Sequence, residues 1–536
     1  MQEFTQLTQR LIDRYQEWSR SLQTKEEGGT ISVDEVASRV ASFYEKMRGV
    51  IDWKEEHLLR KTAVERILKR RLFLKKNLNK DEKIAEPFIH ELIRGGHFPN
   101  ETIPESKIGE VQRLIDKYIF ILDNSPATKK ERAKMYFHDW LFGVAACEIE
   151  ATLSPSLKES ALIDLMTESM KEGIQVREKA GMPGISEAET DTQLYIAVQR
   201  ALFKLDTPTI TYHLLNRWYP DWANLPHPAL NEIAANIYLI WKKIEDALKH
   251  PLAEKFYTVC ERYDTPYLIL GDIVAQNPTQ ALENLGNPEI LEGKIKEAYG
   301  IRLKKVKKKM KRAAIYSTIS IFITKVLVAI SIEVPFDQYV TQQFDYLISV
   351  LSVITPPVLM FFLVLSIRPP SKRNADLVIM EVMKIVYGKE KKNIYEIKPA
   401  LRRGLILNFF IVIFYLASFV LSYGLIVWGL QKMHFSVLSI AIFLIFVSMI
   451  SFAGVKIRQR AKELMVEKEK DTFLHTLIDL FSLPIIQVGR WLSNQWVKYN
   501  AVAVLFNSLL DMPFQLFVEF LEQWRFFLKE KKEKLH

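Results

Sequence analysis

Lys325 is the residue of this chain whose type and position most strongly suggest chemistry. It is the only charged residue in an otherwise apolar run, 313–332. An ammonium group in hydrocarbon is costly, so such a residue normally faces protein or a water-filled cavity. One interpretation is that Lys325 lines a polar path for an ion, a substrate or a segment of a client protein. The other, which we favour, is that its long side chain extends to Glu333 or Asp337, about two turns or more along the chain.

Two adjacent prolines, Pro356 and Pro357, interrupt a second apolar run, 346–367. They remove two backbone donors, which predicts a kink or a local unwinding of that helix. Such breaks form binding sites in some transporters, but they also occur as plain packing features, and we favour packing here. Lys325, Pro356 and Pro357 are therefore the candidate functional residues inside the apolar runs.

Motifs for enzymatic chemistry are missing from the sequence. It contains no Walker-type glycine loop, no G-x-G-x-x-G, no H-E-x-x-H and no G-x-S-x-G. With 20 glycines in 536 residues, it offers few places for a phosphate-binding loop. The two cysteines, Cys147 and Cys260, are too few for a disulfide framework or a thiolate metal site. We therefore expect no enzyme and no cofactor, and we assign no catalytic, cofactor-binding or metal-binding residue.

Four apolar runs, each with about the 20 residues that a helix needs to cross a bilayer, organise the second half of the chain. They cover residues 313–332, 346–367, 405–430 and 435–455. The connections between them alternate in charge. The segments before the first run, between the second and third (368–403) and after the fourth (456–470) are rich in Lys and Arg, whereas 333–345 has three acids and no base, and 431–434 carries only Lys432.

This alternation predicts the orientation of the chain. Lys and Arg stay on the cytoplasmic side during insertion, so we expect a multi-pass protein of the cell (inner) membrane with both termini in the cytoplasm. The basic juxtamembrane segment, 304–312, should contact anionic lipid headgroups. Its seven basic residues are Lys304, Lys305, Lys307, Lys308, Lys309, Lys311 and Arg312. The net charge of +10 is concentrated near helix ends, which argues against nucleic acid as a partner.

Residues 1–303 show apolar stripes at helical spacing, separated by Pro- and Gly-containing breaks. We expect an all-helical cytosolic region, with two lobes divided near residue 125. Its densest polar group, His138, Asp139, Glu148 and Glu150, is interpreted as a solvated helix face. The predicted fold class is thus all-α, with a large helical N-terminal region, a four-helix transmembrane bundle (313–455) and C-terminal amphipathic, interfacial helices.

The C-terminal segment, 456–536, is apolar but interrupted. Pro484, Gly489 and Arg490 break its apolar stretches, which are too short to span. We favour helices that lie in the inner interface or pack under the bundle, anchored by tryptophans at headgroup level. The alternative is a helical subdomain that docks on residues 1–303.

Two functions fit this layout. In the first, which we favour, the chain is a membrane-anchored interaction or scaffold protein whose cytosolic region recruits a protein partner. In the second, it is a channel, a transporter or a client-handling membrane protein with Lys325 on a polar path; four helices are few for a path, so this function requires a homo-oligomer. Replacing Lys325 with leucine should be neutral or stabilising in the first case and should abolish flux in the second.

Overall fold

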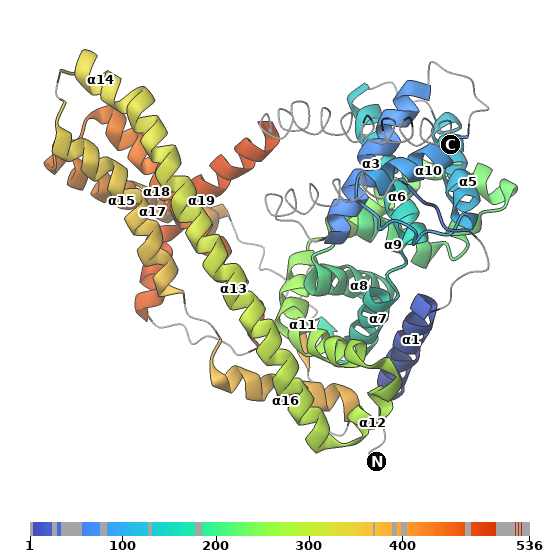
Figure 1. Cartoon of the computed structure of the whole chain (residues 1–536). Helices are drawn as coiled ribbons and strands as arrows, with labels where there is room; N and C mark the ends of the chain where they lie inside the picture. The colour runs from blue at the N-terminus through green and yellow to red at the C-terminus, as the bar shows by residue number, and fades with distance from the viewer. Residues whose placement is uncertain are drawn as a thin grey trace.

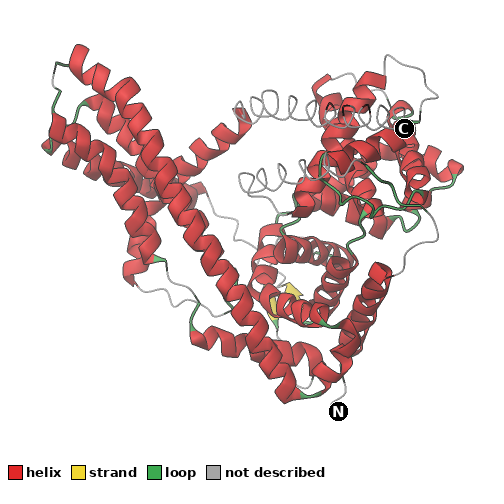
Figure 2. Cartoon of the chain, viewed as in Figure 1, coloured by secondary structure: helices red, strands yellow, loops and turns green. Residues whose placement is uncertain are grey.

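The computed structural model describes most of the chain. The described residues are 4–23, 29–33, 56–75, 83–126, 131–176, 185–342, 344–367, 370–388, 394–397, 405–466, 473–499, 520, 524 and 527. The fold is all-α, as predicted, with two three-residue strands as the only named strands among the described residues (Figures 1 and 2).

The helical domain is built from the N-terminal helices around one connected core that runs from Leu11 to Leu464. Polar side chains cap the starts of two of these helices: Ser186 and Glu189 form a reciprocal capping box at α8, and Asp206 caps α9. The helices are α1 (Gln6–Gln23), α3 (Glu56–Lys75), α4 (Ala85–Arg94), α5 (Ser106–Asp123), α6 (Glu131–Leu153), α7 (Leu157–Lys171), α8 (Glu187–Phe203), α9 (Thr207–Trp218), α10 (His227–Leu248), α11 (Ala253–Gln276) and α12 (Ala281–Gly286), with 3-10 turns η1 (Trp222–Asn224) and η2 (Pro278–Gln280).

The predicted division near residue 125 falls between α5 and α6. These two helices pack against each other, and residues from both belong to the same core, among them Ile121 and Phe137. The core is therefore continuous across this position.

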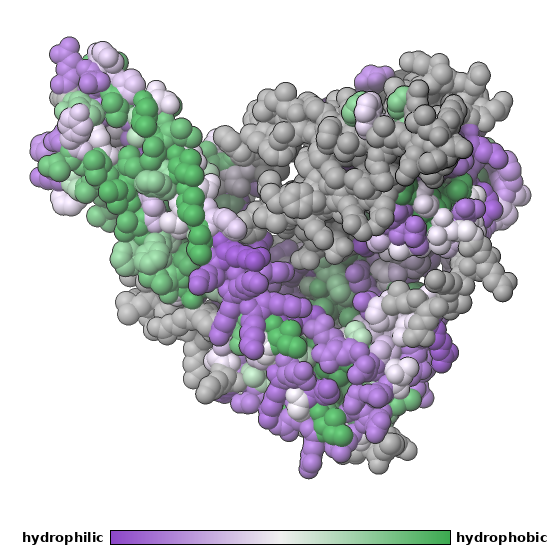
Figure 3. Space-filling model, viewed as in Figure 1, coloured by the Kyte–Doolittle hydropathy of each residue, from purple (hydrophilic) through white to green (hydrophobic). Residues whose placement is uncertain are grey.

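Among the described residues, four helices are long and apolar enough to cross a membrane, as predicted. The first is α13 (Pro288–Val328), which continues through a π-helical segment, η3 (Ala329–Glu333), into α14 (Val334–Tyr339). The others are α15 (Tyr346–Ser366), α17 (Leu405–Lys432) and α18 (Val437–Ala461). The first helix thus extends past residue 332, where its apolar run ends. Figure 3 shows the apolar surface gathered over these helices.

α13 joins the helical domain to the membrane-spanning bundle without a break (Figure 1). Its first turns bury Leu291 and Ile295 in the domain core, and its later turns bury Ala313 against Met360 and Ile450 of the bundle. A continuous helix is a stiff connection, so the domain is joined to the bundle by a rigid element and not by a flexible linker.

The connection between the second and third spans, predicted as a loop over 368–403, contributes to the domain core. It contains α16 (Lys372–Tyr387), whose Val378, Val382 and Val386 are fully buried in that core. It also contains strand β2 (Tyr395–Ile397), which pairs in parallel with β1 (Ile174–Val176).

Asn374 of α16 ties together three parts of the chain. Its fully buried side chain donates hydrogen bonds to the hydroxyl of Tyr299 (3.0 Å) and to the carbonyl of Leu464 (2.5 Å). Its Oδ1 accepts one from the amide of Val466 (2.8 Å). It therefore follows that three segments lie on the same side of the bundle: the helical domain, the connection after α15 and the segment after α18. This is what two pairs of crossings require.

The last long helix is α19 (Phe473–Tyr499), and it packs on α17 and α18. Most of the predicted C-terminal segment beyond residue 499 lies outside the described residues.

Candidate functional site in the membrane-spanning bundle

Lys325 lies fully buried in the bundle and is paired with an acid. Its Nζ donates a hydrogen bond to Oε1 of Glu333, and the Glu333 side chain is itself only 5% exposed. Of the two acids that the sequence offered as partners, Glu333 forms the ion pair with Lys325. Oδ2 of Asp337 instead lies 3.4 Å from the hydroxyl oxygen of Ser439. The pair is enclosed by the bundle, so Lys325 does not reach out to the surface.

The π-helical segment explains how two residues eight positions apart meet. In a regular α-helix, residues seven apart share a face, because two turns take about 7.2 residues. A π turn takes in an additional residue per turn. Because Ala329–Glu333 is π-helical, Glu333 returns to the face of Lys325.

Two other spans close the site. From α15, Ser352 donates a hydrogen bond from Oγ to Oε2 of Glu333 (3.2 Å) and is 1% exposed. From α18, the ring centroid of Phe446 lies 5.5 Å from Nζ of Lys325, within the range of a cation–π contact. Groups from three of the spans thus meet at the ion pair, which favours one alignment of these helices along their lengths.

Pro356 and Pro357 lie in this neighbourhood, but α15 is not unwound at them. The helix is continuous from Tyr346 to Ser366, so the unwinding that the sequence allowed is absent from this described stretch. Pro356 has no amide hydrogen, and the carbonyl of Ser352, four residues earlier, therefore lacks its helical donor. Ser352 thereby supplies both a hydroxyl bound to Glu333 and a carbonyl without a helical partner.

Sequence reasoning singled out Lys325 but missed Ser352 and Phe446 and placed Glu333 outside the span. Serine and phenylalanine are common in membrane helices, so neither carried a signal of its own. Acidic residues on the Lys325 helix were considered as partners only beyond its apolar run. The π turn that brings Glu333 inward has no distinct sequence pattern.

The seven basic residues of 304–312 are all exposed on α13. Five of them lie between Val306, which is buried in the domain core, and Ala313, which is buried in the bundle, and the other two directly precede Val306. In Figure 3 a hydrophilic band directly borders the apolar surface of the bundle along this helix. This is the depth at which lipid headgroups would lie if the bundle spans a bilayer.

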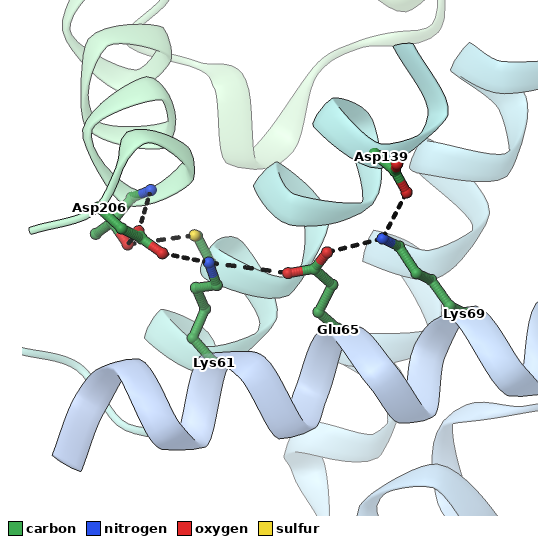
Figure 4. A network of polar contacts seen from close by, with 7 residues as sticks. Lys61, Glu65, Lys69, Asp139 and Asp206 are labelled. Atoms are coloured by element: carbon green, nitrogen blue, oxygen red, sulfur yellow. Dashed lines mark hydrogen bonds and ion pairs between the residues drawn. The ribbon is translucent and has the colours of Figure 1, made fainter. Parts of the chain in front are cut away.

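A polar network inside the helical domain joins α3, α6 and the start of α9 (Figure 4). Lys61 pairs with Asp206 (2.6 Å) and Glu65 (3.8 Å), and Lys69 pairs with Glu65 and Asp139 (2.8 Å each). Its charges alternate in sign, so each one is compensated. We interpret the network as a structural connection between helices.

Cys147 borders this network and is not set up as a nucleophile. Its Sγ lies 3.6 Å from the Thr209 hydroxyl, and burial raises the pKa of the thiol to about 12. A thiol with so high a pKa is almost entirely protonated near neutral pH and is therefore unreactive. Among the described residues no group of three or more potential metal ligands comes together.

Glu148 corrects one interpretation of the sequence. It was assigned to a solvated helix face, but it is 1% exposed and forms a buried ion pair with Lys117, at 2.7 Å to each carboxylate oxygen. The neighbouring Asp139 is exposed, as expected. Apolar neighbours of Glu148 along α6 gave the hint, because Gly143–Cys147 are all buried.

Asp264 borders a pocket of about 360 Å³ where the domain meets α13. The pocket is also lined by Lys204, Arg302, Lys305, Lys309 and the acids Glu159, Asp272 and Glu463. The carboxyl is 4% exposed and lies 3.1 Å from the Thr265 hydroxyl. Burial raises the pKa of Asp264 to about 7, although the charge of Lys204 opposes this shift.

This raised pKa predicts a pH dependence of stability. The folded state holds the proton of Asp264 more tightly than the unfolded state, in which the pKa is about 3.9. The free energy of unfolding should therefore fall as the pH rises from about 4 to 7, and the loss is complete above 7. The Asp264→Asn variant lacks this titrating group. The free energy of unfolding of the variant minus that of the wild type should therefore increase by about 2 kcal/mol between pH 5.5 and pH 8. Thermal unfolding of the full chain in detergent at both pH values measures this, with the exposed Asp246→Asn as control. An equal offset at both pH values would contradict the prediction.

Comparison of the chain with family models, with curated proteins and with solved structures finds no significant match.

Proposed function

We propose that this protein is a membrane-anchored, non-enzymatic interaction protein whose helical domain holds a protein partner at the membrane surface. The observation that carries the proposal is that the core of the helical domain includes α16 and β2, which lie between spans. Together with the continuous α13, this gives the domain a fixed orientation toward the bundle. A fixed orientation suits a surface that presents one face to a partner.

The helical domain also has a surface suited to protein contact. Among the described residues of α1–α12, three large apolar side chains are more than half exposed: Met135 (62%), Tyr136 (59%) and Leu239 (68%). Leu239 lines a groove of about 530 Å³ together with Trp218, Tyr219, Leu225 and Pro226. Exposed apolar and aromatic side chains around a groove are typical of protein interfaces.

We place this domain in the cytoplasm, on the inner face of the cell membrane. The support is the exposed basic band 304–312, next to which the anionic headgroups of the inner leaflet would lie. The alternative function, in which Lys325 lines a polar path, receives less support. The Lys325 side chain has no exposed surface, and its charge is met by Glu333.

The test uses the full chain with a photo-crosslinking residue in place of Asn236, an exposed residue that lines the same groove, irradiated in cells and purified in mild detergent. We expect one main crosslinked partner, and we expect Leu239→Glu to lower the recovery of that partner about tenfold, the loss of one interface hot spot. Ala235→Glu, which adds the same charge at an exposed position of the same helix outside the groove, should retain it. The proposal fails if the wild type recovers no partner above an abundance-matched membrane protein, or if Leu239→Glu recovers the partner unchanged.

An exposed position outside the groove, Asp246, tests the orientation of the domain. Cys147 and Cys260 are both buried, so a thiol introduced by Asp246→Cys dominates labelling of the folded protein. A membrane-impermeant maleimide should label it only after the cells are opened. Labelling of intact cells would place the domain outside.

A further inference from the structure

α19 contacts two spans at positions deep inside them. Its residues Leu480 and Phe481 meet Ser418 and Ser422, which lie near the middle of α17. Gly489 meets Ser448, near the middle of α18. A helix on the membrane surface would contact only the ends of these spans.

Serine hydroxyls of α17 replace the helical hydrogen bond that the proline of α19 removes. Pro484 has no amide hydrogen, so the carbonyl of Leu480, four residues earlier, loses its helical donor. The hydroxyl of Ser418 donates to that carbonyl (3.0 Å). The hydroxyl of Ser422 lies 2.9 Å from the next carbonyl, that of Phe481. Serine hydroxyls from neighbouring helices satisfy proline-freed carbonyls in this way inside membranes, where no water can do so.

Two further contacts fit α19 between its neighbours. A Cβ added to Gly489 would lie 2.0 Å from the carbonyl oxygen of Ser448, so only glycine permits this approach. The hydroxyl of Tyr415 on α17 donates to Oε1 of Gln487 (2.7 Å). The residues that seemed to exclude α19 from the membrane, Pro484 and Gly489 among them, are thus those that its neighbours accommodate.

We propose that α19 is a membrane-embedded helix, a fifth member of the bundle that links α17 to α18. Few contacts join α17 directly to α18, and its serines at 418 and 422 face α19. Arg490 is exposed one residue after Gly489. Membranes accommodate an arginine at such a depth by snorkelling of the side chain together with local thinning of the bilayer. The composition of α19 therefore understates how deeply it lies.

A double-mutant cycle tests the contact. Ser418→Ala leaves the Leu480 carbonyl without a donor and should lower the thermal midpoint of the full chain in detergent by several degrees. Pro484→Ala gives that carbonyl a helical amide, so Ser418→Ala should cause no further loss in the Pro484→Ala chain. Ser366→Ala is the control, because the hydrogen bond described for its hydroxyl stays within its own helix, to the carbonyl of Leu363. Equal losses in both backgrounds would show that Ser418 does not serve this carbonyl.

Labelling in native membranes tests the depth independently of the contact. Three single substitutions are compared with a water-soluble maleimide: Leu483→Cys on α19 (45% exposed), Val420→Cys on α17 (64%) and Asp246→Cys at an exposed position of the helical domain outside the groove. We expect Leu483→Cys to react as slowly as Val420→Cys and at least tenfold more slowly than Asp246→Cys, with all three reacting fully after denaturation. If Leu483→Cys reacts as fast as Asp246→Cys in the membrane, α19 lies outside the hydrocarbon layer and the proposal is wrong. This result does not depend on whether a partner occupies the groove.

Discussion

Replacing Lys325 with leucine is expected to destabilise the bundle by about 3–5 kcal/mol, because the change leaves Glu333 as an uncompensated buried charge. The Glu333 side chain is 5% exposed, and it would keep only the hydroxyl of Ser352 as a donor. The sequence alone gave the opposite expectation, since an isolated lysine in hydrocarbon costs stability and its removal should be neutral or favourable. The intramembrane partner reverses the sign.

Thermal unfolding of the full chain in detergent measures this effect. Replacing both partners, Lys325→Leu with Glu333→Leu, should restore most of the lost stability, because buried ion pairs can be exchanged for apolar residues at little cost. Lys311→Leu, an exposed lysine on the same helix, serves as the control and should change stability little. A single variant as stable as the wild type would contradict the pairing.

The same two variants separate the candidate functions. For an interaction protein, the double variant should bind its partner as the wild type does, because the bundle is again intact. For a path that needs the charge at position 325, the double variant should fold and yet have lost all flux in liposomes. Flux that depends on Lys325 would therefore overturn the proposed function even if stability behaves as expected.

The spans were predictable because they depend on composition summed over about 20 residues, and such sums tolerate local errors. The all-α fold followed in the same way from repeated helical spacing. Contacts between distant segments were not predictable. Val378, Val382 and Val386 of α16 do repeat at helical spacing, but nothing local indicates that they bury against the N-terminal helices.

The candidate site was predicted only in part, and the reason is geometric. Lys325 could be found because a charge in an apolar run stands out. Glu333 required knowledge of the π turn, and Ser352 required knowledge of how α15 packs on α13. The same limit applied to α19, where Pro484 and Gly489 counted against a membrane position until their partners on α17 and α18 were known.

Within the helical domain, Lys117→Met is expected to have the largest effect on stability, again about 3–5 kcal/mol. Lys117 is 7% exposed and donates to both oxygens of Glu148 and to the carbonyl of Trp222 (2.9 Å). Burial lowers the pKa of Lys117, while the charge of Glu148 opposes this shift. Without the ammonium group, the Glu148 carboxylate would keep the hydroxyl of Tyr118, also on α5, as a donor.

The loss should also release the segment that carries Trp222. This indole is fully buried and donates to the hydroxyl of Tyr118 (3.2 Å), so it depends on the same cluster. Thermal unfolding of the full chain measures the stability, and tryptophan fluorescence follows the exposure of the segment. Lys107→Met on the same helix is the control. It breaks a partly exposed pair with Glu110 and should cost a small fraction of about 3–5 kcal/mol. The double variant, Lys117→Met with Glu148→Leu, should recover much of the stability that Lys117→Met loses. If Lys117→Met costs no more than Lys107→Met, the cluster does not stabilise the domain, because a buried carboxylate left without its counter-ion cannot be tolerated at so small a cost.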